Sequence, residues 1–197
     1  MRKDTFIDKI ELLAKDIFDI SDVKKLFPEE AHINTAMKRL VDSGSIIKVA
    51  RGIYMLRGHS FDVEKLATKL YYPSYISFES ALSKYGIINQ GLYNLTLATT
   101  RHSKKITLMD VGCDYSKLKP ELFFGFNLTG GTYIAEPEKA VLDMLYLISL
   151  GKRTKRTDEW HTEELDRDKL KKYLPPFGVV VGNAVRELLG IETAIPL

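Results

Sequence analysis

Residues 32–58 read HINTAMKRLVDSGSIIKVARGIYMLRG, and this stretch decides the fold of the amino-terminal part of the chain. Its first half has the period of a helix that buries a single stripe, with apolar side chains at i, i+3, i+4, i+7 and i+8: Ile33, Ala36, Met37, Leu40 and Val41. Gly44 follows as a natural left-handed cap. Two runs of strand-forming residues then flank Ala50-Arg51-Gly52, which predicts a hairpin with a basic tip.

Two further helices are predicted upstream of this stretch. Apolar residues at helical spacing predict the first helix over about residues 4–15: Phe6, Ile10, Leu13 and Ile17. Ser21 is a good N-cap, without a full capping box, for a short second helix that runs to about Leu26 and stops at Pro28. Three helices followed by a hairpin are the order of a winged helix-turn-helix, which we predict over residues 1–58.

The positive charge of the chain is concentrated in the same stretch. The 197 residues carry 29 Lys and Arg against 26 Asp and Glu, a net charge of only +3. Residues 32–58 nevertheless hold five basic residues against Asp42 alone, whereas residues 59–197 are close to balanced. A local excess of this kind is the electrostatic footprint of a protein that binds an anionic polymer.

Helical geometry places a polar face opposite the apolar stripe, and we predict that this face and the hairpin bind double-stranded DNA. The predicted contact residues are His32, Asn34, Thr35, Lys38, Arg39, Lys48 and Arg51. Asn34 would read an adenine edge and Arg39 a guanine edge, because a major groove admits one helix. The two lysines and Arg51 would neutralise phosphates, and Thr35 could serve either purpose. The alternative is a polar face that is merely solvated, and a lone His32 is more often a capping or surface residue.

Residues 59–197 are predicted to form a second, α+β domain with a small antiparallel or mixed sheet. The predicted strands are 92–99, 105–109, 121–128 and 132–135. Predicted helices begin after Ser60, after Ser77, at Pro137 and near Val179, and they end before Pro73, at Gly86, at Gly151 and at Gly190. Residues 152–172 carry charges of both signs and indicate a solvated loop with the exposed side of a helix.

Composition excludes several classes of protein. Cys113 is the single cysteine, so neither an internal disulfide nor a cysteine-rich zinc site is available. We expect a cytoplasmic protein, because no secretory signal and no stretch of about 18 apolar residues occurs. The acidic neighbours Asp110 and Asp114 are expected to raise the pKa of the Cys113 thiol, which disfavours a catalytic thiolate.

We expect no catalytic residue, no metal and no cofactor. A nucleotidyltransferase needs a Gly-Ser turn followed by paired carboxylates that bridge two metal ions, and no such pairing follows any Gly-Ser. Phosphate-binding glycine loops are missing and the histidines are scattered. Glu136, Glu138 and Asp143 are expected to complement the dipole of a helix start. Residues 101–105, RHSKK, are either an ordinary charged turn or a surface that extends the DNA footprint or touches RNA.

Three segments resemble the antitoxins of type IV toxin-antitoxin systems, the AbiEi family of abortive-infection proteins. They are GIYML at 52–56, PSYISFESALSKYGII at 73–88 and YIAEPEKAVLDMLYL at 133–147. None of them is a catalytic signature, so the resemblance rests on the amino-acid sequences of the segments, their order and their spacing. It does not extend past residue 150.

The resemblance implies a winged helix that binds operator inverted repeats and represses its own operon, together with a carboxy-terminal domain that neutralises a nucleotidyltransferase-like toxin. It does not imply a stable complex with the toxin, and inverted repeats are compatible with a homodimer on DNA. The alternative is a one-component transcriptional regulator whose second domain senses a small molecule, since a winged helix joined to an α+β domain also describes sensors.

Overall fold

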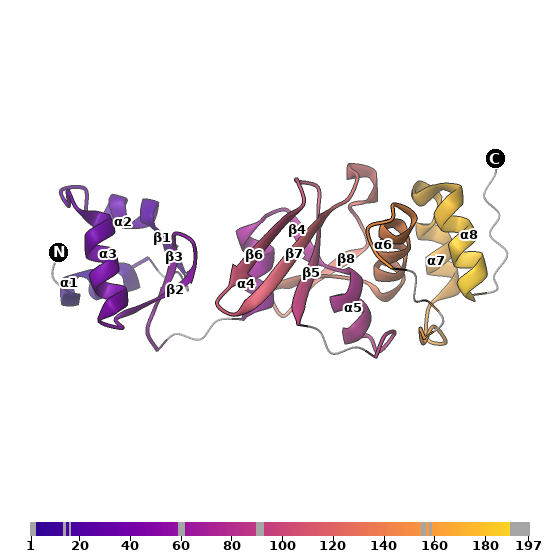
Figure 1. Ribbon diagram of the computed structural model, residues 1–197, viewed down its shortest axis with the longest axis horizontal. Coiled ribbons are helices and arrows are strands. Elements are labelled where there is room, and N and C mark those ends of the chain that lie inside the picture. The colour runs from indigo at the N-terminus through magenta and orange to yellow at the C-terminus, as the bar shows by residue number, and fades with distance from the viewer. Residues whose placement is uncertain are drawn as a thin grey trace. The chain divides into compact units, whose positions relative to one another are not determined.

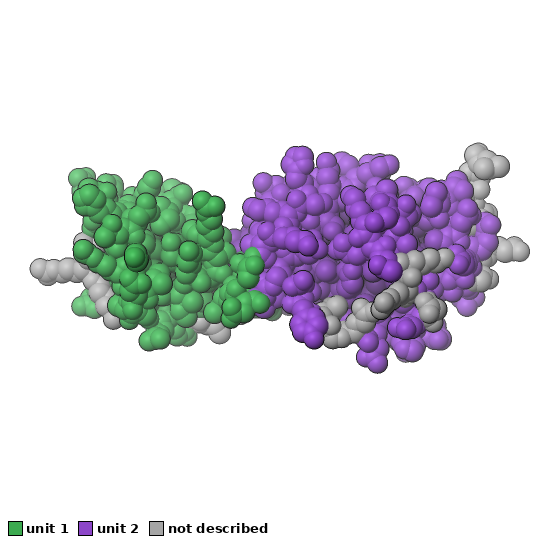
Figure 2. All heavy atoms as spheres, viewed as in Figure 1, with its two compact units in different colours: residues 1–62, 107–110 green, residues 63–106, 111–197 purple. Residues whose placement is uncertain are grey.

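The computed structural model describes residues 3–13, 15, 17–58, 62–89, 93–154, 157 and 159–189. In these residues the chain is a mixed α+β protein with eight α-helices and two sheets. It divides into two compact units, coloured separately in Figure 2. Unit 1 comprises residues 1–62 and 107–110, and unit 2 comprises residues 63–106 and 111–197. The predicted boundary after residue 58 adjoins residues 59–61, which lie outside the described part.

Unit 1 consists of three helices and a three-stranded sheet, drawn in indigo to violet in Figure 1. Its elements are α1 (Lys3–Glu11), β1 (Phe18–Asp19), α2 (Ile20–Leu26), α3 (Ile33–Asp42), β2 (Ile46–Ala50) and β3 (Ile53–Leu56). The strand order is β1-β3-β2, and both pairings are antiparallel. The core packs the inner sides of all three helices against the sheet, with these buried residues: Phe6, Ile10, Phe18, Val23, Ile33, Met37, Leu40, Ile46 and Leu56.

The start of α2 differs from the sequence prediction. The N-cap is Asp19 and not Ser21, and a full capping box is present. The Asp19 carboxylate accepts the Asp22 N–H at 2.9 Å, and the Asp22 carboxylate accepts the Asp19 N–H at 3.1 Å. Helix α1 also ends earlier than predicted, at Glu11, so Leu13 and Ile17 are only half-buried beyond its end.

Unit 2 contains a mixed six-stranded sheet in the order β6-β7-β5-β4-β9-β8. The strands are β4 (Ser74–Ile76), β5 (Asn94–Thr99), β6 (Lys104–Leu108), β7 (Val111–Lys117), β8 (Phe126–Thr129) and β9 (Thr132–Ala135). Strand β4 is antiparallel to β5 and parallel to β9, β5 is parallel to β7, and β8 is antiparallel to β9. The starts of β4, β6 and β9 therefore share one end of the sheet with the ends of β5, β7 and β8.

Helices cover this sheet and extend beyond it. Their bounds are α4 (Val63–Leu70), α5 (Phe78–Lys84), α6 (Pro137–Ser149), α7 (Arg167–Tyr173) and α8 (Gly178–Leu189), with 3-10 turns at Pro120–Leu122 and Pro175–Phe177. Helix α4 packs on β4 and β9, and α5 packs on β5 and α6. Helices α7 and α8 pack on α6, as the orange and yellow ribbons of Figure 1 show.

The predicted strands of unit 2 were partly wrong. Strands β4 and β7 were missed, and residues 121–125 form no strand because Pro120 begins a 3-10 turn there. The predicted cap at Ser60, strand start at Leu92 and helix end at Gly190 lie outside the described residues. No described helix is long and apolar enough to cross a membrane.

Candidate nucleic-acid interface

Helix α3 carries a buried stripe and an exposed polar face, as its sequence period predicted. Ile33, Met37 and Leu40 are buried in the core of unit 1. On the opposite side lie the exposed residues of the predicted interface: Asn34, Thr35, Lys38 and Arg39. Because the apolar stripe is anchored, these side chains keep a fixed angular position on the surface of unit 1.

The two ends of α3 are formed by different devices. His32 is the N-cap and is exposed, but its side chain makes no capping hydrogen bond. At the other end, Gly44 adopts a φ of +66° and its N–H donates to the Val41 carbonyl oxygen at 2.8 Å. A left-handed residue here stops the helix and turns the chain directly into β2. The first turn of α3 contains no acidic side chain that would repel an anion.

The hairpin that follows carries the other two predicted contacts. Lys48 and Arg51 are both exposed, Lys48 within β2 and Arg51 in the two-residue turn that separates the paired Ala50 and Ile53. The pairing shifts register between Lys48 and Ala50, an irregularity that increases the local twist of a hairpin. The next turn residue, Gly52, has a φ of +78°, which a residue with a side chain rarely adopts.

The cations of this surface have no ion-pair partner among the described residues. Lys38, Arg39, Lys48 and Arg51 form no ion pair with any carboxylate in the described part of the chain. All seven predicted contact residues belong to unit 1, five at the cap and on the exposed face of α3 and two on the hairpin. No hydrogen bond among the described residues joins the two groups, so the donors of each group face solvent independently.

Sequence reasoning missed a polar network buried in unit 2. The side chains of Lys139 and Asp143, four residues apart on α6, are fully buried and form an ion pair. The Tyr75 and Ser77 hydroxyls donate to the same Asp143 oxygen at 2.9 and 2.8 Å, and the Lys139 ammonium donates to the Tyr75 hydroxyl at 2.9 Å. Burial lowers the pKa of Lys139 and raises the pKa of Asp143, because it disfavours both charged forms.

This network corrects two predictions. Asp143 does not complement the start of α6, because it lies in the second turn and is bonded in the interior. Ser77 does occupy the N-cap of α5, but its hydroxyl donates to Asp143 and makes no capping bond. Glu136 and Glu138 do lie at the start of α6, where they also hold α7: Glu138 accepts the Asp166 N–H, and Glu136 pairs with Lys169 at 3.0 Å.

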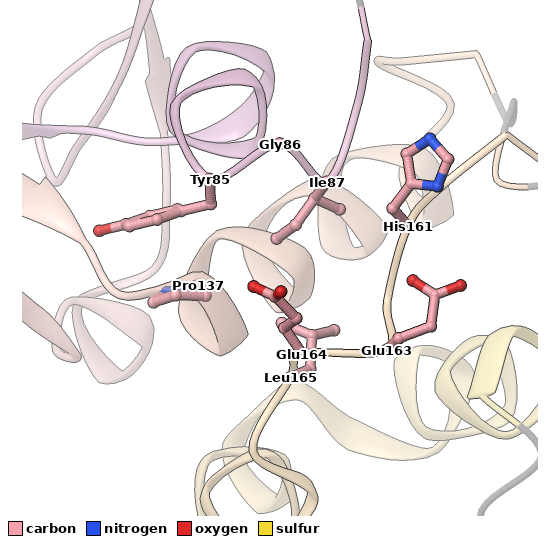
Figure 3. A pocket seen from close by; sticks show the side chains of 8 residues that line it. All are labelled: Tyr85, Gly86, Ile87, Pro137, His161, Glu163, Glu164 and Leu165. Atoms are coloured by element: carbon pink, nitrogen blue, oxygen red, sulfur yellow. The ribbon is translucent and has the colours of Figure 1, made fainter.

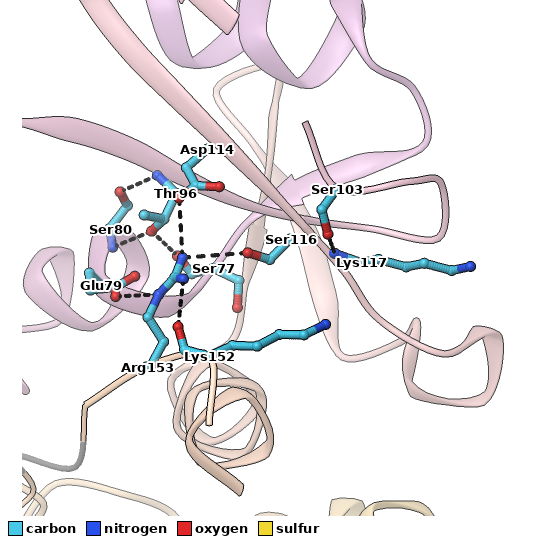
Figure 4. Close-up of polar contacts among 10 residues, drawn as sticks. All are labelled: Ser77, Glu79, Ser80, Thr96, Ser103, Asp114, Ser116, Lys117, Lys152 and Arg153. Atoms are coloured by element: carbon cyan, nitrogen blue, oxygen red, sulfur yellow. Dashed lines mark hydrogen bonds and ion pairs between the residues drawn. The ribbon is translucent and has the colours of Figure 1, made fainter. Parts of the chain in front are cut away.

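A second polar cluster of unit 2 surrounds Arg153 (Figure 4). Its Nε donates to the Glu79 carboxylate at 2.8 Å, and its Nη2 contacts Asp114 at 3.5 Å and the Ser116 hydroxyl at 3.4 Å. The guanidinium therefore ties the segment after α6 to α5 and to β7. With its donors committed to protein acceptors, Arg153 is a structural residue rather than a ligand-binding one.

A cavity of about 400 Å³ lies where α5 ends and α6 begins. It is lined by Tyr85, Gly86, Ile87, Pro137, His161, Glu163, Glu164 and Leu165 (Figure 3). The Tyr85 hydroxyl already donates to the Ala135 carbonyl oxygen at 2.8 Å, and the His161 N–H donates to the Ile87 carbonyl oxygen at 2.9 Å. The volume suits a small molecule, and the glutamates would favour a cationic one.

Neither a reactive thiol nor a cluster of metal ligands appears in the described residues. Cys113 is buried, and burial raises the pKa of its thiol to about 11. The cause is desolvation and not the neighbouring acids that the sequence suggested. No group of three His, Cys, Asp or Glu side chains within the described ranges could hold a metal ion.

Comparison with known proteins adds no assignment. A scan against protein-family models finds no match for this chain, and a search of curated proteins finds no similar sequence. Functional inference therefore depends on the surfaces and contacts described above.

Proposed function

We propose that unit 1 is a winged helix-turn-helix that binds duplex DNA and that the chain is a transcriptional repressor. The observation that carries the proposal is the exposed polar face of α3, which lies opposite a buried stripe and bears cations without carboxylate partners. Strand β1, between α1 and α2, supports it, because pairing with β3 fixes the hairpin to the helical part of the unit. A helix and an adjacent β-loop are the two parts that such a domain uses on DNA.

The proposed roles of the contact residues follow from the chemistry of their side chains. Asn34 and Arg39 have the donors that read adenine and guanine edges, and they project from the same exposed face. Lys48 and Arg51 on the hairpin contact phosphates, which orients the domain without reading sequence. Operator binding should therefore depend on Arg39 in a sequence-specific way and on Arg51 in a sequence-independent way.

We further propose that the repressor acts as the antitoxin of a type IV toxin-antitoxin system, autoregulating its operon and counteracting a nucleotidyltransferase-like toxin. The support is the resemblance of three segments, two of which meet in unit 2. Residues 73–88 supply Tyr75 and Ser77, and residues 133–147 supply Lys139 and Asp143, so the buried network joins these two segments. The two segments therefore pack together in one substructure, which contains the parallel strands β4 and β9 and the helices α5 and α6.

Fluorescence anisotropy with the chain's own upstream DNA tests the first proposal. Arg39→Ala should weaken specific binding by about 1 to 3 kcal/mol and leave non-specific binding nearly unchanged. Arg51→Ala should weaken binding to all sequences alike and lower the salt slope by about 1. Lys171→Ala, on α7 beside Asp168, is the matched loss of one positive charge. Wild-type affinity in both Arg39→Ala and Arg51→Ala would refute the assignment of α3 and the hairpin.

Co-expression with the neighbouring gene tests the second proposal. Expression of the full chain should restore growth when an adjacent nucleotidyltransferase-like protein is toxic, and Arg39→Ala should lose repression while keeping this rescue. Failure to rescue, with operator binding intact, would remove the antitoxin role and leave the repressor.

The cavity beside Tyr85 favours one alternative, a regulator that senses a small molecule. In that case a cationic metabolite should change operator affinity, and Glu163→Gln together with Glu164→Gln should abolish the change. A downstream open reading frame with nucleotidyltransferase residues favours the antitoxin, whereas an adjacent metabolic operon favours the sensor.

A further inference from the structure

The strand order of unit 2 brings cations from distant parts of the sequence to one end of the sheet. Strand β7 ends at Lys117, and the pairing of Ser74 with Thr99 and of Thr99 with Lys117 places the start of β4 beside it. The Lys117 N–H donates to the Ser103 hydroxyl at 2.9 Å, so the start of β6 lies there as well. We call the exposed side chains at this end the sheet-end patch: Lys69, Tyr72, Arg101, His102, Lys104 and Lys117.

A buried tyrosine beneath the patch holds two of its cations in place. The Arg101 guanidinium lies 4.3 Å from the centre of the Tyr71 ring, and the Lys104 ammonium lies 5.3 Å from the same ring centre. Arg101 also donates to the Tyr72 carbonyl oxygen at 3.4 Å. The Tyr71 hydroxyl in turn donates to the His102 carbonyl oxygen at 2.9 Å. The two cations therefore stand side by side on a fixed aromatic support.

The charges of the patch are not neutralised by the protein. Its lysines and Arg101 form no ion pair with a carboxylate within the described ranges. The acid found at this end is Glu121, which lies 3.9 Å from the neighbouring Lys119. Some other cations of unit 2 are paired with carboxylates, such as Lys84 with Glu64 and Lys169 with Glu136. Cations at one end of the sheet that have no ion pair among the described residues are available to an anionic partner outside the chain.

The exposed ring of Tyr72 indicates which kind of anion the sheet-end patch would bind. Tyr72 is 67% exposed although its neighbour Tyr71 is buried. A phosphate backbone alone needs only the cations, whereas an exposed ring on Tyr72, the residue whose carbonyl oxygen accepts from Arg101, offers a stacking surface to an unpaired base. The bases of a duplex are already stacked on one another and would leave Tyr72 unused. We propose that the sheet-end patch binds a single-stranded stretch of polynucleotide, with the cations on phosphates and a base stacked on Tyr72.

This surface lies wholly in unit 2, so it can be tested apart from the proposed DNA-binding unit. The full chain is titrated into fluorescein-labelled oligo(U) RNA, oligo(dT) DNA and a non-operator duplex of equal length at fixed salt. Tyr72→Ala should weaken binding to a single strand by roughly 5- to 150-fold, the range measured for loss of one stacked base. Tyr72→Phe should retain binding, and duplex affinity should not change in either variant. Comparison of the two single strands shows whether the 2′-hydroxyl contributes.

Matched variants separate stacking from general charge and from fold. Tyr93 is 94% exposed and adjoins Asn94, the start of β5, at the opposite end of the sheet, so Tyr93→Ala should bind like wild type. Arg101→Ala with Lys104→Ala should lower the salt slope for a single strand by about 1.4, because two phosphate contacts are lost. Arg39→Ala should retain single-strand binding even if it loses the operator. Trp160 fluorescence confirms that each variant is folded.

Three results would overturn the proposal. Equal single-strand affinity of Tyr72→Ala and Tyr93→Ala would remove the stacking role. Parallel loss of duplex and single-strand binding in Arg101→Ala with Lys104→Ala, with no effect of Tyr72→Ala, would assign the patch to duplex DNA. Absence of single-strand binding by the wild-type chain at low salt would exclude the partner altogether.

Discussion

The ion pair of Lys139 and Asp143 allows a sharp test of how unit 2 is held together. Both side chains are fully buried, and Asp143 accepts hydrogen bonds from Lys139, Tyr75 and Ser77. In Lys139→Met the buried carboxylate keeps only its two hydroxyl donors, and in Asp143→Asn the buried ammonium loses its counter-charge. Removing one member of such a pair costs about 3 to 5 kcal/mol, because the other charge stays uncompensated. The double variant buries no charge and should be more stable than either single variant.

The two single variants should respond to pH in opposite directions. Burial already raises the pKa of Asp143 above its ordinary 3.8, and loss of Lys139 raises it further. A group with a raised folded pKa contributes stability at low pH and loses it as pH rises through the folded value, so Lys139→Met should lose stability as pH rises above 3.8. Burial lowers the pKa of Lys139 below 10.5, and loss of Asp143 lowers it further. Asp143→Asn should therefore gain stability as pH rises toward 10.5. Each slope is at most about 1.4 kcal/mol per pH unit.

Urea denaturation followed by the fluorescence of Trp160, the single tryptophan of the chain, reports on unit 2 alone. Titrations at several pH values between 5 and 9 give the free energy of unfolding of wild type, both single variants and the double variant. We expect a coupling energy of about 2 to 3 kcal/mol between the two positions. Additive effects of the two substitutions, or identical pH slopes in both single variants, would refute the view that the charges compensate each other in the interior.

Three further predictions follow from single sites. Asp19→Ala removes the capping box that starts α2 and should lower the free energy of unfolding of unit 1 by about 1 kcal/mol, measured by urea denaturation monitored by circular dichroism. Burial raises the pKa of Glu136, but hydrogen bonds from three side chains outweigh it and hold the pKa below 4.5. The stability that these hydrogen bonds contribute is present above pH 4.5 and is lost as pH falls. The difference in the free energy of unfolding between wild type and Glu136→Gln should therefore shrink below pH 4.5. Cys113, with a pKa of about 11, should react with a disulfide reagent at pH 8 only after unfolding, and rapid reaction of the native chain would contradict its burial.

The elements of unit 1 could be predicted from the sequence wherever the repeat of apolar residues was long enough to measure. Helix α3 was predicted from five apolar positions, and its bounds and exposed face agree with that stripe. Strand β1 was not predicted, because two residues have no measurable period. The same two residues explain why the N-cap of α2 was predicted at the wrong residue, because Asp19 both ends β1 and caps α2.

Unit 2 shows what a local pattern cannot reveal. Strand β7 contains Gly112, Asp114 and Ser116, residues typical of turns, yet it lies between β6 and β5 inside the sheet. A Cβ at position 112 would lie 2.2 Å from the Asn94 side-chain oxygen, so a larger residue there would displace the Asn94 side chain. That close approach depends on the pairing of Asn94 with Gly112, and the sequence does not state a pairing across 18 positions.

The buried sites differ in how far they could have been predicted. Lys139 and Asp143 are four residues apart on a helix whose other buried positions are apolar except for Glu138, and this spacing indicates an internal ion pair. The Arg153 cluster gave no comparable signal, because its partners Glu79 and Asp114 are 74 and 39 residues away in the chain. Only the fold brings those three side chains together.

The distribution of ion pairs within the protein indicates more about its binding partners than its net charge does. A value of +3 would be ordinary for a protein of this size, and most cations of the unit 2 interior are consumed by carboxylates. The exposed cations without an ion pair among the described residues include those on the α3 face and hairpin of unit 1 and those of the sheet-end patch of unit 2. The first surface offers Asn34 and Arg39 on a rigid helix, which suits the edges of paired bases, and the second offers an exposed ring, which suits unpaired ones. If both proposed surfaces bind as we propose, substitutions at Arg39 and Tyr72 should separate duplex binding from single-strand binding.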